Sequence, residues 1–238
     1  MTVTLAYRGN DGQACIIGDS CASDSFSHSA VKNHKVFHPV GRRDITIGCA
    51  GTFRLPNLLQ FVPGVFPPED ELPTDEIDLS YLINEFTPVI RAMTDDFEDD
   101  DVWECLIAVG DRIYRMQMDL SILEPADDCD AIGCGGPVAL GAFKVLNELE
   151  PDMPMEERMN HALRVACETV QGCQGPFLLV KNEKLPDDIL KKAKEFCEDH
   201  DRDIGYAIIR HDEDLHDEEV QERAKNNKKK KKKKKGVI

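Results

Sequence analysis

The chain has 238 residues, of which 41% are hydrophobic, enough for one sizeable domain and too few for two large ones. Its formal net charge of −16 opposes binding of the folded body to nucleic acid. No stretch approaches the roughly 20 apolar residues of a membrane span, and residues 1–8 lack the basic and apolar regions of a secretory signal. We therefore expect a cytoplasmic protein without membrane association.

The nine cysteines are scattered and form no Cys-x-x-Cys pair, which disfavours zinc-ribbon and thioredoxin-like proteins. Most stand in apolar segments, where a free cysteine behaves as a small hydrophobic residue. His34 and His38 lie in an extended segment, which places them about 13 Å apart. We expect reduced thiols and no metal site.

In chain order, the first predicted strand covers residues 2–8, and removal of Met1 makes Thr2 the first residue. An α-amine titrates at about 7.7–8.0, so part of it is neutral at cellular pH and can accept the hydroxyl proton. Threonine with its own amine is a recognised activated nucleophile. Met-Thr is also a common protein start. The downstream residues therefore decide whether Thr2 is a nucleophile or an ordinary first residue.

A turn signal at residues 10–12 joins this strand to a second one at residues 14–17, which ends in Gly18-Asp19. A carboxylate at the end of a buried strand needs a partner, although a turn-capping aspartate gives the same pattern. Lys35 begins another apolar segment, where a snorkelling surface lysine is the alternative. Residues 44–52 follow as a strand whose Gly51 lets backbone amides approach a ligand closely.

The remaining pattern alternates helices and strands. An amphipathic segment at 55–61 precedes an acidic, proline-bearing insert at 63–78, which reads as a solvated loop. Predicted helices cover residues 79–93, 136–149 and 155–171, and predicted strands cover 103–110, 112–118 and 177–180. The apolar faces predicted for the last two helices are Val138, Ala142, Val145 and Leu149, then Met159, Leu163, Ala166 and Val170. This order fits two stacked sheets with a helical layer on each side.

Thr2, Gly18-Asp19, Lys35-Val36 and Cys49-Ala50-Gly51 together resemble the proteasome β-subunits and, more closely, the bacterial HslV peptidase. Residues 130–137 match a further block, which in this family is a strand ending in a Gly-Ser-Gly-Gly turn. The resemblance covers roughly residues 2–180. It implies an α+β fold, a four-layer αββα sandwich of the N-terminal-nucleophile hydrolase type, and threonine endopeptidase activity.

The resemblance also implies residue roles. Thr2 is nucleophile and base, Lys35 lowers the cost of its alkoxide, and Asp19 pairs with Lys35. The amide of Gly51 supplies an oxyanion hole, where one aimed donor contributes about 2.7–4 kcal/mol. Glu168, beside Thr169, falls near the family's supporting acidic group.

Further positions follow from the same comparison. Cys134 replaces the family serine near the threonine amine, and because a thiol is a weaker donor and acceptor, we expect a softened hydrogen-bond network. Ala22 and Cys49 fall where relatives line the pocket for the residue before the cut, and both are small, so we expect tolerance of medium or large apolar residues there. The only cofactor that the resemblance implies is a structural cation near the turn from Cys167 to Cys173.

Relatives form hexamer- or heptamer-based homo-oligomeric rings that degrade proteins and peptides in an inner chamber. The chain has no Gly-x-x-x-x-Gly-Lys-Ser/Thr motif, so an ATPase unfoldase would be a separate chain. Two alternatives stay open: a catalytically weak or inactive ring or scaffold protein of the same fold, and an amidase acting on small molecules.

We expect the hydrolase domain to cover residues 1–183 and a helix–strand extension to cover residues 184–210. Residues 211–238 are first acidic and then contain eight consecutive lysines, from Lys228 to Lys235, a pattern typical of disorder. The lysines allow three interpretations: a solvated tail, a weak anchor for nucleic acid or another anion, or a partner for the acidic stretch before them.

Overall fold

The computed structural model describes residues 1–9, 13–23, 28–30, 34–98 and 101–182. They lie within one compact unit, Met1–Lys184. The predicted extension at 184–210 and the tail at 211–238 are outside the described residues. No helix in the described part of the chain is long and apolar enough to cross a membrane.

The described residues form the predicted strands and helices in the predicted order, with three additional short strands. The strands are β1 (Thr4–Arg8), β2 (Ala14–Asp19), β3 (Cys21–Ser23), β4 (His28–Ala30), β5 (Val36–Phe37), β6 (Ile45–Gly51), β7 (Trp103–Val109), β8 (Arg112–Gln117), β9 (Ile122–Leu123), β10 (Cys129–Ile132) and β11 (Phe177–Lys181). The helices are α1 (Arg54–Phe61), α2 (Leu79–Tyr81), α3 (Thr87–Thr94), α4 (Gly136–Leu149) and α5 (Met155–Thr169), with a 3₁₀ turn η1 (Thr74–Glu76) and a π-helical turn η2 (Leu82–Phe86). The additional strands are β3, β4 and β9. The single helix predicted at residues 79–93 contains the π-helical turn η2.

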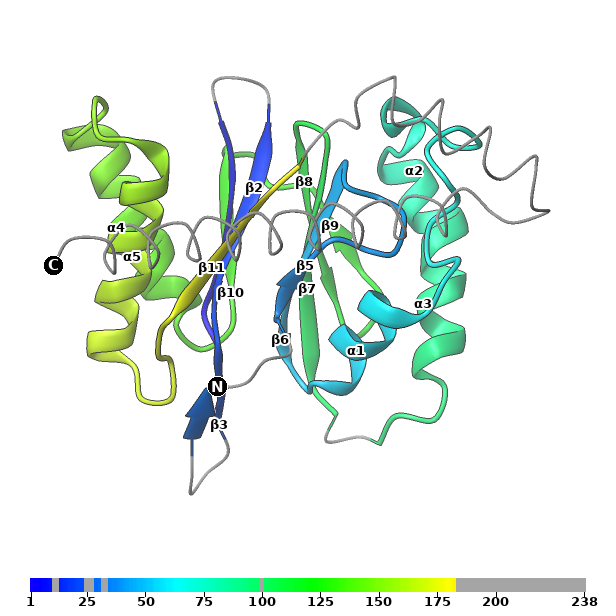
Figure 1. The fold of residues 1–238 in the computed structure, drawn as a ribbon, viewed down its shortest axis with the longest axis horizontal. Coiled ribbons are helices and arrows are strands. Elements are labelled where there is room, and N and C mark those ends of the chain that lie inside the picture. The colour runs from blue at the N-terminus through cyan, green and yellow to red at the C-terminus, as the bar shows by residue number, and fades with distance from the viewer. Residues whose placement is uncertain (10–12, 24–27, 31–33, 99–100, 183–238) are drawn as a thin grey trace, which may run out of the picture. The chain divides into compact units, whose positions relative to one another are not determined.

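Two antiparallel sheets lie at the centre, one in the order β10-β1-β2-β11 and the other in the order β5-β6-β7-β8-β9. Helices α4 and α5 cover the outer face of the first sheet, and α1, α2 and α3 cover that of the second (Figure 1). This is the four-layer αββα sandwich, so the predicted fold class is confirmed.

Strand β2 shows how the sequence produces the layers, because successive side chains in a strand point to opposite faces. Cys15 and Ile17 pack in the core beneath α4 and α5, whereas Ala14 and Ile16 pack between the two sheets. All four are essentially buried, so β2 is apolar on both faces. Such a strand must lie at the centre of a layered fold.

The insert at residues 63–78 is not the solvated loop that its prolines and acidic residues predicted. Val65, Phe66 and Ile77 are buried beneath the second sheet, and the ring of Phe66 stacks on Phe86 at 4.7 Å. Buried Arg42 also ties this segment down by donating hydrogen bonds to two of its backbone carbonyls. Periodicity within the insert could not show these contacts, which come from distant elements.

The apolar face predicted for α4 is confirmed for Val138 and Ala142, which pack against the core, and is wrong for Val145 and Leu149. The bounds of the helix are confirmed. Val145 is 54% exposed and Leu149 is 69% exposed, whereas Ala139 and Phe143 are fully buried. The Phe143 ring packs edge-on against Tyr7 of β1, with ring centroids 5.0 Å apart, and this contact sets the rotation of the helix. The predicted buried face of α5 is confirmed for Met159, Leu163 and Ala166.

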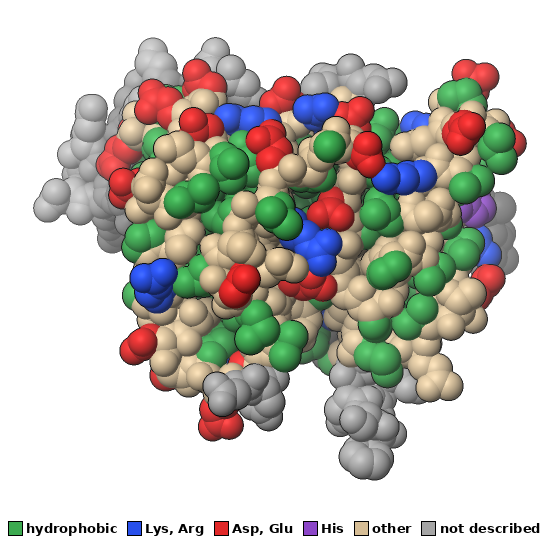
Figure 2. Space-filling view, turned by 180° about the vertical axis from the view of Figure 1, so that it is seen from behind, with side chains coloured by type: hydrophobic (Ala, Val, Ile, Leu, Met, Phe, Trp, Pro, Cys, Tyr) green, Lys and Arg blue, Asp and Glu red, His purple; other side chains and the backbone are tan. Residues whose placement is uncertain are grey.

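In the whole chain, 45 acidic residues outnumber 29 basic ones. Figure 2 shows one face, on which acidic side chains are more frequent than basic ones and apolar side chains are interspersed among both.

Candidate active site

Thr2 lies just before β1, at one end of the first sheet, and is only 4% exposed. The pairing of β1 with β2 brings Asp19 to it, since Thr4 faces Gly18 in the register. Two hydrogen bonds then lock the strand ends together: the Val3 amide donates to Asp19 Oδ1 at 3.0 Å, and the Asp19 amide donates to the Val3 carbonyl at 3.1 Å. The hairpin therefore places a carboxylate beside the first residues of the chain.

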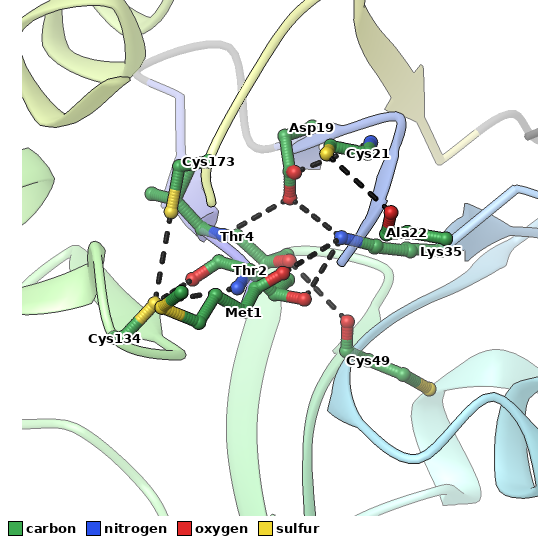
Figure 3. A network of polar contacts seen from close by, with 11 residues as sticks. Met1, Thr2, Thr4, Asp19, Cys21, Ala22, Lys35, Cys49, Cys134 and Cys173 are labelled. Atoms are coloured by element: carbon green, nitrogen blue, oxygen red, sulfur yellow. Dashed lines mark hydrogen bonds and ion pairs between the residues drawn. The ribbon is translucent and has the colours of Figure 1, made fainter. Parts of the chain in front are cut away.

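Lys35 approaches from the second sheet, immediately before β5. Its carbonyl accepts a hydrogen bond from the Cys49 amide of β6 at 2.9 Å, which anchors its backbone. Its Nζ donates to Thr2 Oγ1 at 2.8 Å and to Asp19 Oδ1 at 2.9 Å (Figure 3). Thr2, Asp19 and Lys35 are thus brought together, as the sequence predicted.

The Lys35–Asp19 ion pair is buried, with side chains only 3% and 0% exposed. Burying two charges is costly unless they are paired and their remaining hydrogen-bonding capacity is satisfied. Asp19 accepts from the amides of Val3 and Cys21 in addition to Lys35. These bonds offset the desolvation and hold the ammonium group against the Thr2 hydroxyl.

An open pocket of about 420 Å³ lies beside Thr2, lined in part by Gly51, Gly133 and Cys134. Gly51 has a φ of +102°, and a Cβ there would lie 2.0 Å from the Val102 carbonyl oxygen. Gly133 has a φ of +81°, and a Cβ there would lie 2.3 Å from the Thr2 carbonyl oxygen. Only glycine allows these close approaches.

Met1 is 51% exposed, and its carbonyl accepts a 3.4 Å hydrogen bond from Lys35. The Thr2 nitrogen is a peptide N–H here, at the place that the α-amine would take in a chain beginning at Thr2. It donates to the sulfur of Cys134 at 3.4 Å, and the Cys134 thiol donates back to the Thr2 carbonyl at 3.5 Å. Cys134 therefore contacts the backbone of the candidate nucleophile.

Glu104 was not predicted as a site residue. It lies on β7, where Oε1 accepts from the Gly133 amide at 2.7 Å and Oε2 pairs with Arg115 at 2.7 Å. Glu104 therefore holds the turn that carries Cys134. The signal for it in the sequence is a lone carboxylate within an otherwise apolar strand, a polar residue at a core position.

Cys173, in the segment after α5, was also missed. Its Sγ lies 3.7 Å from that of Cys134, and the two residues are 39 positions apart in sequence. Burial raises the pKa of the Cys173 thiol well above its usual value, and the nearby Cys134 raises it further. Nothing in the local sequence around Cys173 indicates this proximity.

Three predicted residues, Cys49, Ala22 and Glu168, neither line the pocket beside Thr2 nor form a hydrogen bond with the Thr2 side chain. The Cys49 thiol points into the helix-covered core, 3.5 Å from the sulfur of Cys105, and burial raises its pKa. Ala22 lies on β3, outside this pocket. Glu168 is exposed near the end of α5 and lines a second cleft of about 380 Å³, together with Cys173.

The turn from Cys167 to Cys173 does not fit a cation held by side chains. Burial raises the pKa of Cys167 to about 11 and that of Cys173 further, so a cation bound by these thiols would have to displace their protons. A cysteine ligates metals as the thiolate. Within the described residues, no group of three or more His, Cys, Asp or Glu side chains could hold a metal ion.

No protein-family model matches the sequence, and no curated protein does. Solved structures do match. The structure of Thiobacillus denitrificans BPH in complex with epoxomicin is 17% identical, with a TM-score of 0.62, over 77% of this chain and 100% of that chain. Eukaryotic HslV from Trypanosoma brucei is 16% identical, with a TM-score of 0.56, over 76% and 99% of the two chains.

Anbu from Yersinia bercovieri, described as an ancestral β-subunit, is 13% identical, with a TM-score of 0.55, over 76% of this chain and 81% of that chain. Together these structures show that the chain has the α+β fold of HslV and of related proteins.

Proposed function

We propose that the chain is a threonine endopeptidase of the proteasome and HslV type, with Thr2 as nucleophile after removal of Met1. The observation that carries the proposal is the buried contact of Lys35 with both Thr2 Oγ1, at 2.8 Å, and Asp19, at 2.9 Å. A scaffold gains nothing from burying a charge pair against a hydroxyl, because apolar residues of the same size stabilise a fold as well or better.

In the first half of the reaction, the freed Thr2 amine accepts the hydroxyl proton while Oγ1 attacks the peptide carbonyl carbon. The ammonium group of Lys35 stabilises the developing negative charge on Oγ1. The carbonyl oxygen becomes an oxyanion, and we assign the Gly51 amide, at the edge of the same pocket, as its donor. The C–N bond then breaks, the leaving nitrogen takes the proton from the Thr2 amine, and an ester on Oγ1 remains.

In the second half, the Thr2 amine accepts a proton from a water molecule, which attacks the ester carbonyl. The C–O bond to Oγ1 breaks and the threonine hydroxyl is restored. Cys134 and Gly135 position Thr2, since both donate a hydrogen bond to its carbonyl oxygen, the Cys134 thiol at 3.5 Å and the Gly135 amide at 3.2 Å.

The substrates we propose are unfolded proteins and peptides with medium or large apolar residues before the cut. The pocket beside Thr2 has an apolar rim, where Val102 is 58% exposed and Met118 is 47% exposed. By its resemblance to HslV, the chain would work in a homo-oligomeric ring and receive substrates from a separate ATPase ring.

Hydrolysis of fluorogenic peptides by purified protein, combined with intact-mass spectrometry, tests the proposal. Active protein should begin at Thr2, and Thr2→Ala should abolish hydrolysis while its thermal unfolding curve stays close to that of the parent. Thr2→Ser should keep part of the rate, because the hydroxyl and the amine remain. Epoxomicin, which BPH binds in its solved complex, should inhibit the parent protein.

Three results would contradict the proposal in different ways. Undiminished hydrolysis by Thr2→Ala would place the nucleophile elsewhere. Active protein that retains Met1 would rule out the amine as base. Correctly trimmed, folded protein without any peptidase activity would favour the scaffold alternative.

A further inference from the structure

The thiols of Cys134 and Cys173 lie at one side of the candidate site, next to Thr2 and opposite Lys35 (Figure 3). Their sulfurs are 3.7 Å apart, and Cys134 contacts both the nitrogen and the carbonyl oxygen of Thr2. The proposed peptidase reaction uses neither thiol as a reacting group. A disulfide requires about 2.05 Å between the sulfurs, so a modest approach of the two side chains would join them.

Solvent reaches the two thiols differently. Cys134 is exposed in the pocket beside Thr2, whereas Cys173 is 5% exposed. An oxidant that enters the pocket therefore meets Cys134 first, with Cys173 held directly behind it. Solvent access and a neighbouring resolving cysteine are two features of redox-sensitive cysteines, and this arrangement has both.

Close approach requires a small residue in the intervening turn. Gly135 provides it, since a Cβ at that position would lie 3.1 Å from the sulfur of Cys173 and 2.8 Å from Cβ of Val3. The turn after β10 can thus lie directly against the segment after α5 and bring the two thiols together.

A second thiol pair provides an internal comparison. Cys49 and Cys105 face each other across β6 and β7 with their sulfurs 3.5 Å apart, closer than the first pair. Both are only 2% exposed and lie in the apolar core. The distance between the sulfurs alone would favour a disulfide between Cys49 and Cys105, whereas access by an oxidant favours one between Cys134 and Cys173.

We propose that Cys134 and Cys173 form a peroxide-sensitive disulfide site that reversibly switches off the Thr2 centre. The sulfur of Cys134 attacks one peroxide oxygen, the O–O bond breaks and one water leaves, which yields a sulfenic acid. Cys173 then gives its proton to the departing hydroxyl while its sulfur attacks the Cys134 sulfur, so the S–O bond breaks and a second water leaves. Two thiols lose two hydrogens and one electron pair, and hydrogen peroxide is reduced to two waters.

The disulfide changes the surroundings of Thr2 in two ways. Cys134 loses the hydrogen that it donates to the Thr2 carbonyl at 3.5 Å. Its sulfur also moves toward Cys173 and away from the position where it accepts from the Thr2 nitrogen at 3.4 Å. Both changes disturb the positioning of the proposed base, so this regulatory consequence rests on the proposed function, whereas disulfide formation does not.

The site is tested without any activity measurement. Full-length protein is treated with a small excess of hydrogen peroxide, its remaining thiols are alkylated after unfolding, and its peptides are mapped by mass spectrometry. We expect a Cys134–Cys173 linked peptide, with Cys49 and Cys105 recovered alkylated. Cys173→Ser should yield no linked peptide and should instead accumulate sulfinic acid at Cys134.

Peptide hydrolysis, followed in the same samples, should fall in proportion to the fraction of linked chains and return on addition of dithiothreitol. A Cys49–Cys105 linked peptide as abundant as the Cys134–Cys173 one, or no linked peptide at all, would contradict the proposed disulfide site. A linked protein that retains full activity would overturn the switch. Reduced protein without activity would contradict the proposed function, while the peptide map would still decide the site.

Discussion

The Lys35–Asp19 pair gives the sharpest test of the site, because each member supports the other. Lys35→Met keeps the length of the side chain and removes the donor that lies 2.8 Å from Thr2 Oγ1. Loss of one aimed donor costs about 10²–10³ in rate. Asp19→Asn should cost a comparable factor, because Lys35 then loses the charge that fixes its position at 2.9 Å.

The double variant separates a shared site from two independent residues. Independent losses would multiply to about 10⁴–10⁶, whereas a single unit should lose little more than Lys35→Met alone. Stability should show the same coupling. Lys35→Met leaves the buried Asp19 carboxylate without its counter-ion, a loss of about 3–5 kcal/mol, and adding Asp19→Asn removes that charge and should restore part of the loss.

The assay is kcat/KM on one fluorogenic peptide, together with urea unfolding of all four proteins. A rate loss in the double variant equal to the product of the single losses would refute the shared site. So would additive losses in the free energy of unfolding, since residues in contact are expected to couple.

Three further predictions concern other parts of the chain. Gly51→Ala should abolish hydrolysis, because its Cβ would lie 2.0 Å from a backbone oxygen. The control Gly141→Ala places its Cβ in open space on α4. It should keep full activity and raise the free energy of unfolding by about 0.5–1 kcal/mol, measured in urea. Arg42→Met should lower the free energy of unfolding by about 3–5 kcal/mol, because it leaves the buried Asp44 carboxylate without its counter-ion. An unchanged midpoint in urea would contradict this. Deletion of residues 225–238 should leave peptide turnover unchanged, and equal retention of the full-length and shortened proteins on heparin at low salt would rule out an anion-binding role for the lysines.

Local patterns in the sequence determined the elements and their order. The continuous apolar run of β2 reflects a strand buried on both faces, and the bounds of α4 follow from the turn that precedes it and from its helical period. The pairing of Thr2, Asp19 and Lys35 was predictable through a resemblance, because these residues occur in the order and with the Asp-to-Lys spacing of the HslV-type family.

Only the tertiary structure decided which faces and which distant residues meet. The rotation of α4 follows from the contact of Phe143 with Tyr7, and the burial of Phe66 follows from its stacking on Phe86. Cys173 approaches Cys134 only because the segment after α5 packs against the turn after β10. Such contacts join residues far apart in sequence, so no local period or turn signal encodes them, and they depend on how whole layers pack.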